Sequence, residues 1–283
     1  IRVSLVGQPA LMSHSQQSPV EHENPQIMRE LCLTRASLGR KVVLLTFDGG
    51  GNDNATTSIL RTLKREHIHA TMFLTGEYMR HYPDLVRQIV AAGNTVGNHT
   101  FSHPHLTTYR FNGRQETLPG VSGPFVESQL KRADVLFKQL TGRNMAPYWR
   151  APFGEYNRQI LEWGALAGYR SVYWTEHLDT LDWVADRKSP LFHTPENVLE
   201  RLIGRSKRAP YGINGGVILM HLGTERNGSS RIDLILPSLI DRLKKEGYSF
   251  TTVDKTAWGR EPAPRPSSFE AAGTRDPSPS PAS

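Results

Sequence analysis

The sequence contains very little cysteine and no long apolar segment. Cys32 is the only cysteine among 283 residues, so no disulfide can form within the chain and no Cys-x-x-Cys metal or redox motif exists. No run of about 18 apolar residues occurs, so we expect no transmembrane segment in this sequence. Because the first residue is Ile1 and not Met, we expect a mature or trimmed chain from which an export signal has been removed.

Acidic residues are fewer than basic ones. The 34 Lys and Arg residues outnumber the 27 Asp and Glu residues and leave a formal net charge of +7. This excess favours contact with nucleic acid, a membrane surface or an acidic cell wall, although many envelope proteins are simply basic. Hydrophobic content of 37% and charged content of 22% are typical of a globular chain with a sizeable core. The length allows one large α/β domain or two small ones.

The two ends of the chain differ from its middle. Residues 1–40 show no hydrophobic periodicity and are predicted to form an irregular N-terminal extension, in which 27–33 could make a short helical turn. Residues 259–283 contain six prolines and almost no large apolar side chains. Such a segment cannot bury enough surface to offset the entropy of ordering, so we predict a disordered tail rich in proline and serine. The catalytic domain is expected over 41–258.

Between the ends, short apolar runs alternate with amphipathic segments. The predicted strands cover 42–47, 70–74, 95–97, 145–149, 171–174, 216–220 and 248–253. The predicted helices cover 55–67, 85–92, 126–140, 158–167, 195–205 and 234–246. About seven β-then-α units predict an α/β fold with a parallel sheet, either doubly wound or closed into a barrel.

Residues with catalytic or ligand chemistry collect where the predicted strands end. They are Asp48, His99, His103, Arg150, Asp182 and His221. In a parallel (β/α) barrel these positions share the C-terminal rim, where active sites assemble. The sequence therefore predicts one site that holds two carboxylates, three imidazoles and a guanidinium.

Two local patterns within this set carry chemistry. His99 and His103 have an i, i+4 spacing that suits a divalent metal, although one such pair among 11 histidines is weak evidence alone. Asp48 precedes Gly49, Gly50 and Gly51, whose lack of side chains permits a tight turn and close approach of a ligand. A helix-capping aspartate or a phosphate-binding loop are the alternatives. No Gly-Lys-Ser/Thr follows, so the loop fits a nucleotide P-loop poorly.

These residues resemble the motifs of the polysaccharide deacetylases, carbohydrate esterase family 4, which share a NodB homology domain. Five motifs occur in family order: Thr-Phe-Asp-Gly-Gly at 46–50, His-Thr-Phe-Ser-His-Pro at 99–104, Arg-Ala-Pro-Phe-Gly at 150–154, Asp-Thr-Leu-Asp-Trp at 179–183 and Leu-Met-His at 219–221. The resemblance covers about residues 42–258. It implies the fold of this family, a distorted (β/α)7 barrel, which agrees with the number of predicted units.

The resemblance also implies roles for the residues at the first three motifs. His99 and His103 would hold a divalent metal, usually zinc, that polarises the acetyl carbonyl and acidifies water. Asp48 would be the general base, and Arg150 would fix its carboxylate. Phe153 would offer its backbone N–H to the oxyanion that develops in the reaction.

The last two motifs imply the remaining roles. His221 would protonate the departing amine as the general acid, and Asp182 would orient its ring. Leu219 and Trp183 would line a small apolar pocket for the acetyl methyl group.

One position departs from the family pattern. Gly49 stands where the family has a second aspartate, the third metal ligand, and glycine has no side chain to bind a metal. A catalytic zinc ordinarily has three protein ligands and a water molecule. Asp53 or Asn52 on the same loop could supply an oxygen, and a carboxylate such as Asp53 would also offset the charge of the ion.

These expectations define a metal-dependent hydrolase that removes N- or O-acetyl groups from a carbohydrate polymer; the expected enzyme class is that of hydrolases of linear amides, to which N-deacetylation belongs. N-acetylglucosamine units of peptidoglycan or a chitin-like glycan are the leading substrates, ahead of acetylated xylan. The enzyme would work outside the cell or in the periplasm, at the cell envelope. A catalytically impaired carbohydrate-binding relative is the alternative, because of Gly49. A nucleic-acid-binding barrel would explain the charge but not the rim residues, so no nucleic-acid partner is expected.

Overall fold

The structure, a computed structural model, describes residues 25–260. Strands β1 to β8 comprise Cys32–Leu33, Val42–Gly49, Thr71–Leu74, Thr95–Asn98, Tyr148–Trp149, Arg170–Val172, Gly216–His221 and Ser249–Thr251. All of the paired strands run parallel to their partners. The parallel α/β fold predicted from the alternation of elements is therefore confirmed.

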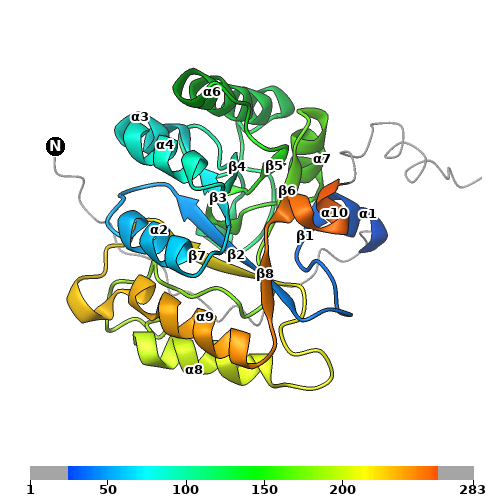
Figure 1. The fold of residues 1–283 in the computed structure, drawn as a ribbon. Helices are drawn as coiled ribbons and strands as arrows, with labels where there is room; N and C mark the ends of the chain where they lie inside the picture. Colours follow the sequence, from blue (N-terminus) through cyan, green and yellow to red (C-terminus); the bar gives the residue numbers. More distant parts are fainter. Residues whose placement is uncertain (1–24, 261–283) are drawn as a thin grey trace, which may run out of the picture.

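The sheet closes into a distorted barrel rather than staying doubly wound. Its strand order is β1-β6-β5-β4-β3-β2-β7, and β8 pairs with the first half of β2. The edge strands β1 and β7 are joined by extended chain. Arg35 forms a bridge with Gly216, and the segment 175–180 hydrogen-bonds to β7 through the amides of Thr175 and Thr180. Figure 1 shows the strands at the centre of the molecule with helices around them.

Alternation along β2 divides the core into two layers. Leu44 packs inside the barrel with residues of neighbouring strands such as Val217. Val43, Leu45 and Phe47 point the other way, into the larger core between the strands and the helices. Because successive side chains of a strand face opposite sides, Thr46 and Asp48 share the inner side with Leu44. This places Asp48 in the barrel mouth.

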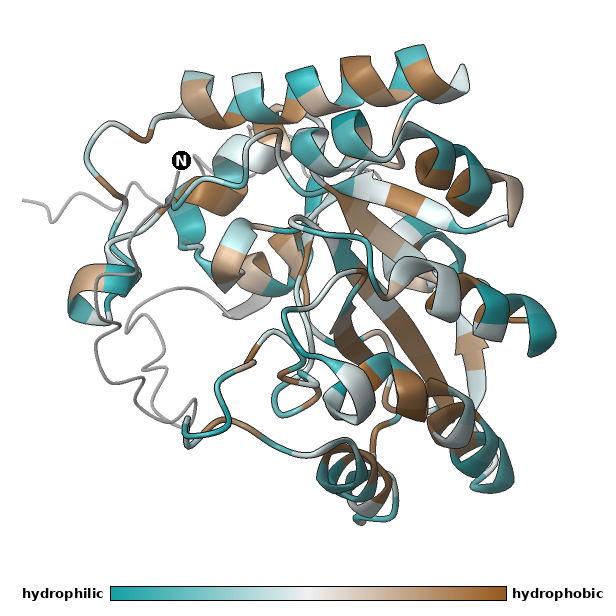
Figure 2. Ribbon diagram, turned by 90° about the vertical axis from the view of Figure 1, so that its left-hand side faces the viewer, coloured by the Kyte–Doolittle hydropathy of each residue, from teal (hydrophilic) through white to brown (hydrophobic). Residues whose placement is uncertain are grey.

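The helices cover the outside of the barrel. They are α1 (Pro25–Leu31), α2 (Thr56–Arg65), α3 (Gly76–His81), α4 (Pro83–Ala91), α5 (Tyr109–Asn112), α6 (Gly123–Thr141), α7 (Arg158–Leu166), α8 (Pro195–Ser206), α9 (Leu236–Lys245) and α10 (Ala257–Arg260). Short 3-10 turns occur at Pro152–Gly154, Gly228–Ser230, Ile232–Ile235 and Val253–Lys255. Figure 2 shows apolar strands inside and mixed helices outside, as expected when each helix buries one face.

The beginning of the barrel differs from the prediction. The irregular extension was expected to reach residue 40, yet β1 pairs with β6 and Leu31, Cys32 and Leu33 are buried. The ordered domain therefore starts before residue 41. Two residues give too short a pattern for a strand to be recognised, because only pairing with β6 defines it.

The C-terminal end of the described chain packs against its beginning. In α10, the Trp258 Nε1 donates a hydrogen bond to the Arg29 carbonyl oxygen at 3.0 Å.

The helix α3 was not predicted from the sequence. It is capped by the Thr75 hydroxyl, which accepts a hydrogen bond from the Tyr78 amide. The predictions for residues 1–24 and 261–283 lie outside the described residues. Among residues 25–260, no helix combines the length and the apolar character needed to cross a membrane.

Candidate active site

Asp48 and Arg150 form a buried ion pair at the barrel mouth. Arg150 Nη1 donates to Asp48 Oδ1 at 2.7 Å, and the guanidinium is fully buried. Its Nη2 donates to the Thr46 hydroxyl at 2.9 Å and its Nε to the Val172 carbonyl oxygen at 2.8 Å. All three nitrogens of the guanidinium therefore have acceptors, as a buried charge requires. The pair fixes the Asp48 carboxylate between β2 and β5.

His99 lies next to Asp48 with one ring nitrogen turned toward it. Its Nε2 is 3.6 Å from Asp48 Oδ2, and its Nδ1 is 2.8 Å from the Arg150 carbonyl oxygen. A carbonyl oxygen can only accept, so Nδ1 carries the proton and Nε2 presents a lone pair. A metal-binding histidine is ordinarily fixed in this way by a carbonyl or carboxylate on its other nitrogen.

His103 completes the pair of imidazoles. The ring centroids of His99 and His103 are 4.8 Å apart. Burial lowers the pKa of His99, although the nearby Asp48 carboxylate opposes the shift. Burial also lowers the pKa of His103 well below its usual value, and His99 and His221 add to this effect. Both rings are therefore held neutral, which is the form that binds a metal.

His221 and Asp182 form the second pair, directly beside Asp48. Asp48 and His221 are partners in the register of β2 and β7. Asp182 Oδ1 lies 2.7 Å from His221 Nδ1, and Asp182 Oδ2 accepts from the His221 backbone amide at 2.7 Å. Burial works against a charged His221 ring, but Asp182, Asp48 and Asp179 together outweigh it and raise its pKa to about 9. The ring is therefore held in its protonated form.

The proposed lining residues Leu219 and Trp183 occupy different environments. Leu219 lies on the inner side of β7 and is buried, two residues before His221. Trp183 is 37% exposed, and its Nε1 is 3.4 Å from Asp179 Oδ2. Asp179 is itself buried and also accepts from the Leu181 amide at 2.7 Å. The buried Asp179 thus holds the loop that carries Asp182 and Trp183.

The glycines after Asp48 differ in the direction that a side chain would take. A Cβ on Gly49 would lie 2.8 Å from Leu74 Cδ2, 3.1 Å from Leu222 Cδ1 and 3.3 Å from Tyr78 Cγ, within the outer core. A Cβ on Gly50 would lie 3.9 Å from His103 Nε2. The position that faces the imidazoles is therefore Gly50, two residues from Asp48, and not Gly49 as expected from the sequence.

Asn52 and Asp53, the two candidates for the third ligand, lie on the loop between Asp48 and α2. The Asn52 side chain joins two loops: its Oδ1 accepts from the Thr224 amide and its Nδ2 donates to Glu225. Asp53 contributes its backbone oxygen to the amide of Thr56, at the start of α2. Within residues 25–260, no three His, Cys, Asp or Glu side chains form a group able to hold a metal. The side chain of Asn52 is therefore used to join two loops, and Asp53 forms no such three-residue group with His99 and His103.

Two residues of the site were missed from the sequence. The His105 ring stacks on Phe153 at 4.0 Å between centroids, and its Nδ1 is 2.7 Å from Glu155 Oε1. Each lies beside a recognised motif, one residue after Pro104 or Gly154. This adjacency was the signal in the sequence that could have identified them, whereas the burial of Glu155 is known only from the structure.

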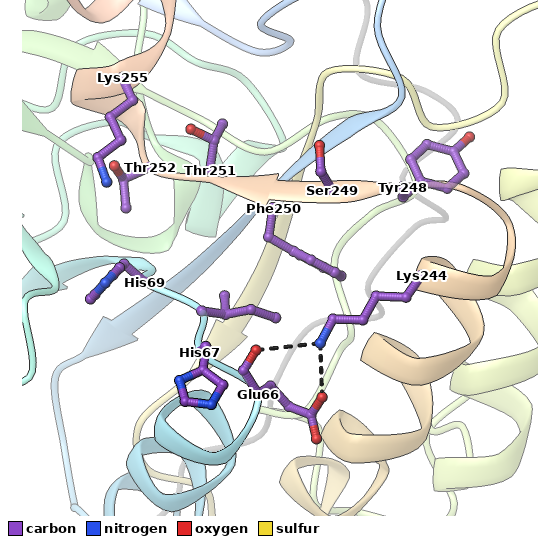
Figure 3. A pocket seen from close by; sticks show the side chains of 11 residues that line it. Glu66, His67, His69, Lys244, Tyr248, Ser249, Phe250, Thr251, Thr252 and Lys255 are labelled. Atoms are coloured by element: carbon purple, nitrogen blue, oxygen red, sulfur yellow. Dashed lines mark hydrogen bonds and ion pairs between the residues drawn. The ribbon is translucent and has the colours of Figure 1, made fainter.

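One cavity lies away from these residues. It has a volume of about 390 Å³ and is lined by residues 66–69, which precede β3, and by residues of the segment 244–255, which includes β8. Figure 3 shows His67, His69 and Lys255 along its wall, with Lys244 bonded to Glu66. Strand β8 lines this cavity and pairs with the first half of β2, whereas Asp48 is near the other end of β2. It is therefore separate from the candidate active site.

Comparison with known proteins agrees with this geometry. The sequence pattern of the polysaccharide deacetylase family matches residues 35–172. An uncharacterized 30.6 kDa protein of Geobacillus stearothermophilus is 30% identical over 215 residues, which cover 76% of this chain and 70% of that protein. The chain belongs to the polysaccharide deacetylase family.

Two further proteins similar to this chain have solved structures. PdaA of Bacillus subtilis, a peptidoglycan-N-acetylmuramic acid deacetylase, is 26% identical over 78% of this chain and 73% of its own. Its structure superposes with a TM-score of 0.66, covering 90% of this chain and 98% of that one. BA3943 of Bacillus anthracis, a pseudoenzyme of carbohydrate esterase family 4, gives a TM-score of 0.62 at 23% identity and covers 80% of this chain and 68% of that one. The barrel fold is therefore that of the family.

Proposed function

We propose that this polysaccharide deacetylase hydrolyses acetyl groups from N-acetylated sugars of a cell-wall polymer. The observation that carries the proposal is the pairing of two opposed groups on neighbouring strands: a carboxylate held by Arg150 and an imidazole held by Asp182. Asp48 and His221 face one barrel mouth from partner positions of β2 and β7. Amide hydrolysis requires a base and an acid on the two sides of one carbonyl carbon.

His99 and His103 are the residues that would hold a divalent metal, with zinc as the expected ion. The residues fit this role in part, because both rings are neutral and His99 presents Nε2 as a lone pair. A bound metal would supply Lewis-acid polarisation of the acetyl carbonyl. The fit stops at two imidazoles, since Gly49 and Gly50 offer no further side-chain ligand.

The protein's own groups would perform the proton transfers. Asp48 Oδ1 is bound to Arg150, which leaves Oδ2 free to accept the proton of the attacking water. His221, protonated and held by Asp182, would deliver a proton to the departing sugar amine. The Phe153 N–H makes no hydrogen bond to another described residue and would donate to the acetyl oxygen as negative charge develops there.

The names of relatives and the charge of the chain support the proposed substrate and location. PdaA acts on peptidoglycan according to its name, and the net charge of +7 of this chain suits an anionic wall. We therefore expect activity at the cell envelope, outside the cytoplasm. The exposed Trp183 at the mouth supplies an apolar surface for a sugar.

A catalytically impaired carbohydrate-binding protein is the second candidate, and the absent third ligand favours it. The similarity to BA3943 shows that the family fold occurs in a pseudoenzyme. Acetate release from peptidoglycan, chitin oligomers and acetylated xylan separates the two candidates when metal-stripped and zinc-reloaded protein are compared. The deacetylase is supported by zinc-dependent release that Asp48→Asn abolishes. Binding of the glycans without any release would instead establish the impaired relative.

A further inference from the structure

Phe153 occupies an unusual backbone conformation beside the imidazole pair. Its φ is 58° and that of Gly154 is 69°. A left-handed conformation is disfavoured for any residue with a Cβ, because Cβ approaches the following carbonyl oxygen. The Phe153 ring is also 54% exposed, so burial of the ring does little to hold the residue in place. Another contact must stabilise this turn.

The ring of Phe153 contacts two imidazoles. His105 stacks against it with centroids 4.0 Å apart and planes 9° apart. His103 meets it edge-on at 4.4 Å and 65°. Aromatic pairs at these distances are attractive in both geometries. Phe153 therefore touches both His103, a candidate metal ligand, and His105.

Glu155 fastens His105 to the Phe153 turn. Its carboxylate is 2% exposed and accepts from the backbone amides of Leu106 and Thr107 at 2.8 Å and 3.1 Å. The other oxygen lies 2.7 Å from His105 Nδ1. Because Nδ1 must donate to a carboxylate, the ring plane of His105 is set by Glu155. One buried side chain thus ties the loop after His103 to the turn that carries Phe153.

We propose that His105 and Glu155 are positioning residues, which keep the Phe153 N–H aimed at the acetyl oxygen and steady the ring of His103. This inference rests on the proposed deacetylase function. The N–H of Phe153 is free of other described partners and follows the conformation of this turn. A donor that must meet the oxyanion contributes mainly in the transition state, so its misplacement lowers kcat more than it changes KM.

Three substitutions separate the two contacts of His105. His105→Ala removes both the stacking and the hydrogen bond. His105→Asn keeps an N–H near the place of Nδ1 but removes the ring. His105→Phe keeps a ring on Phe153 but leaves Glu155 Oε1 without its donor. Glu155→Gln tests the carboxylate itself. His81→Ala is the matched control, because His81 is an exposed histidine on α3 whose Nδ1 contacts the Glu77 carbonyl oxygen.

The experiment measures kcat and KM for acetate release from an N-acetylglucosamine oligomer, and a crystal structure of each variant gives φ at Phe153. We expect His105→Ala and Glu155→Gln to lower kcat by about 10- to 100-fold, as is usual for residues that orient a ligand-binding group. KM should change by less than about threefold, since ground-state binding is retained. His105→Asn and His105→Phe should each recover part of kcat, and His81→Ala should match the wild type.

The outcomes distinguish this proposal from the proposed function. If the wild type releases acetate and His105→Ala keeps its kcat with Phe153 still near φ 58°, the positioning role is refuted. A variant that loses only thermal stability, with kcat unchanged well below its melting temperature, refutes it equally. If the wild type releases no acetate from any substrate, the deacetylase proposal fails. The crystal structures then decide alone whether His105 and Glu155 hold the Phe153 turn.

Discussion

We predict that Gly50→Asp adds a third metal ligand to His99 and His103. The same substitution at the neighbouring Gly49 should not place a carboxylate near the imidazoles. A Cβ on Gly50 would lie 3.8 Å from His103 Cδ2 and 4.0 Å from Thr75 Cγ2, which is ordinary contact. An aspartate oxygen extends about 2.4 Å beyond Cβ, and zinc binds oxygen and imidazole nitrogen at about 2.0–2.2 Å. These lengths, joined at bent angles, bridge the 3.9 Å between that Cβ and His103 Nε2.

Gly49→Asp should have a different effect. Its carboxylate would enter a contact with Leu74, Leu222 and Tyr78, all fully buried. Overpacking costs about 1–3 kcal/mol and burial of a polar group without a partner costs about as much again. A loss of about 3 kcal/mol lowers the melting temperature of a domain of this size by roughly 6–12 °C.

The two substitutions, Gly50→Asp and Gly49→Asp, are tested by the zinc affinity of metal-stripped protein. This affinity is measured by competition with a chromogenic chelator. Gly50→Asp should bind zinc at least about tenfold more tightly than the parent, a gain of about 1.4 kcal/mol. Gly50→Asn is the matched neutral control and should gain much less, because an amide does not offset the charge of the ion. The reasoning fails if Gly49→Asp binds zinc more tightly at an unchanged melting temperature, or if Gly50→Asp binds no better than Gly50→Asn.

Three further predictions concern the same rim. Asp48→Asn should lower kcat by about 10²–10⁴-fold and also reduce stability, because Arg150 is buried and loses its charged partner. Thr46→Val removes the hydroxyl that accepts from Arg150 and donates to the Ile218 carbonyl oxygen, but it leaves the Asp48 carboxylate in place and should keep kcat within a few-fold; equal losses of kcat in both variants would refute Asp48 as the general base. Activity that needs protonated His221 should fall as pH rises through about 9, and Asp182→Asn, which removes the main group raising that pKa, should move this fall to lower pH in a profile of kcat/KM; an unmoved profile would contradict the assignment. Asp53→Ala should leave zinc affinity unchanged in the chelator competition, and a tenfold loss would restore Asp53 as a ligand.

Most of the strands and helices could be predicted because their patterns are local. The apolar run at 42–47 and the periodic segment at 126–140 predicted β2 and α6 from neighbouring residues alone. The strand β1 has two residues and exists only through its pairing with β6, about 140 positions later in the sequence. Such an element has no local signal, so its absence from the prediction reflects the physics of strand pairing.

The sequence predicted which residues form the site, but not the directions in which side chains at neighbouring positions point. The C-terminal ends of parallel strands meet at one rim, so the sequence was sufficient to gather Asp48, Arg150 and His221. The direction of a missing side chain depends on strand alternation continued past the end of β2. Counting by twos from Asp48 leads to Gly50, whereas matching a motif letter by letter leads to Gly49. Motif matching therefore predicted that a ligand is missing, and the backbone direction shows at which position a new side chain would face the imidazoles.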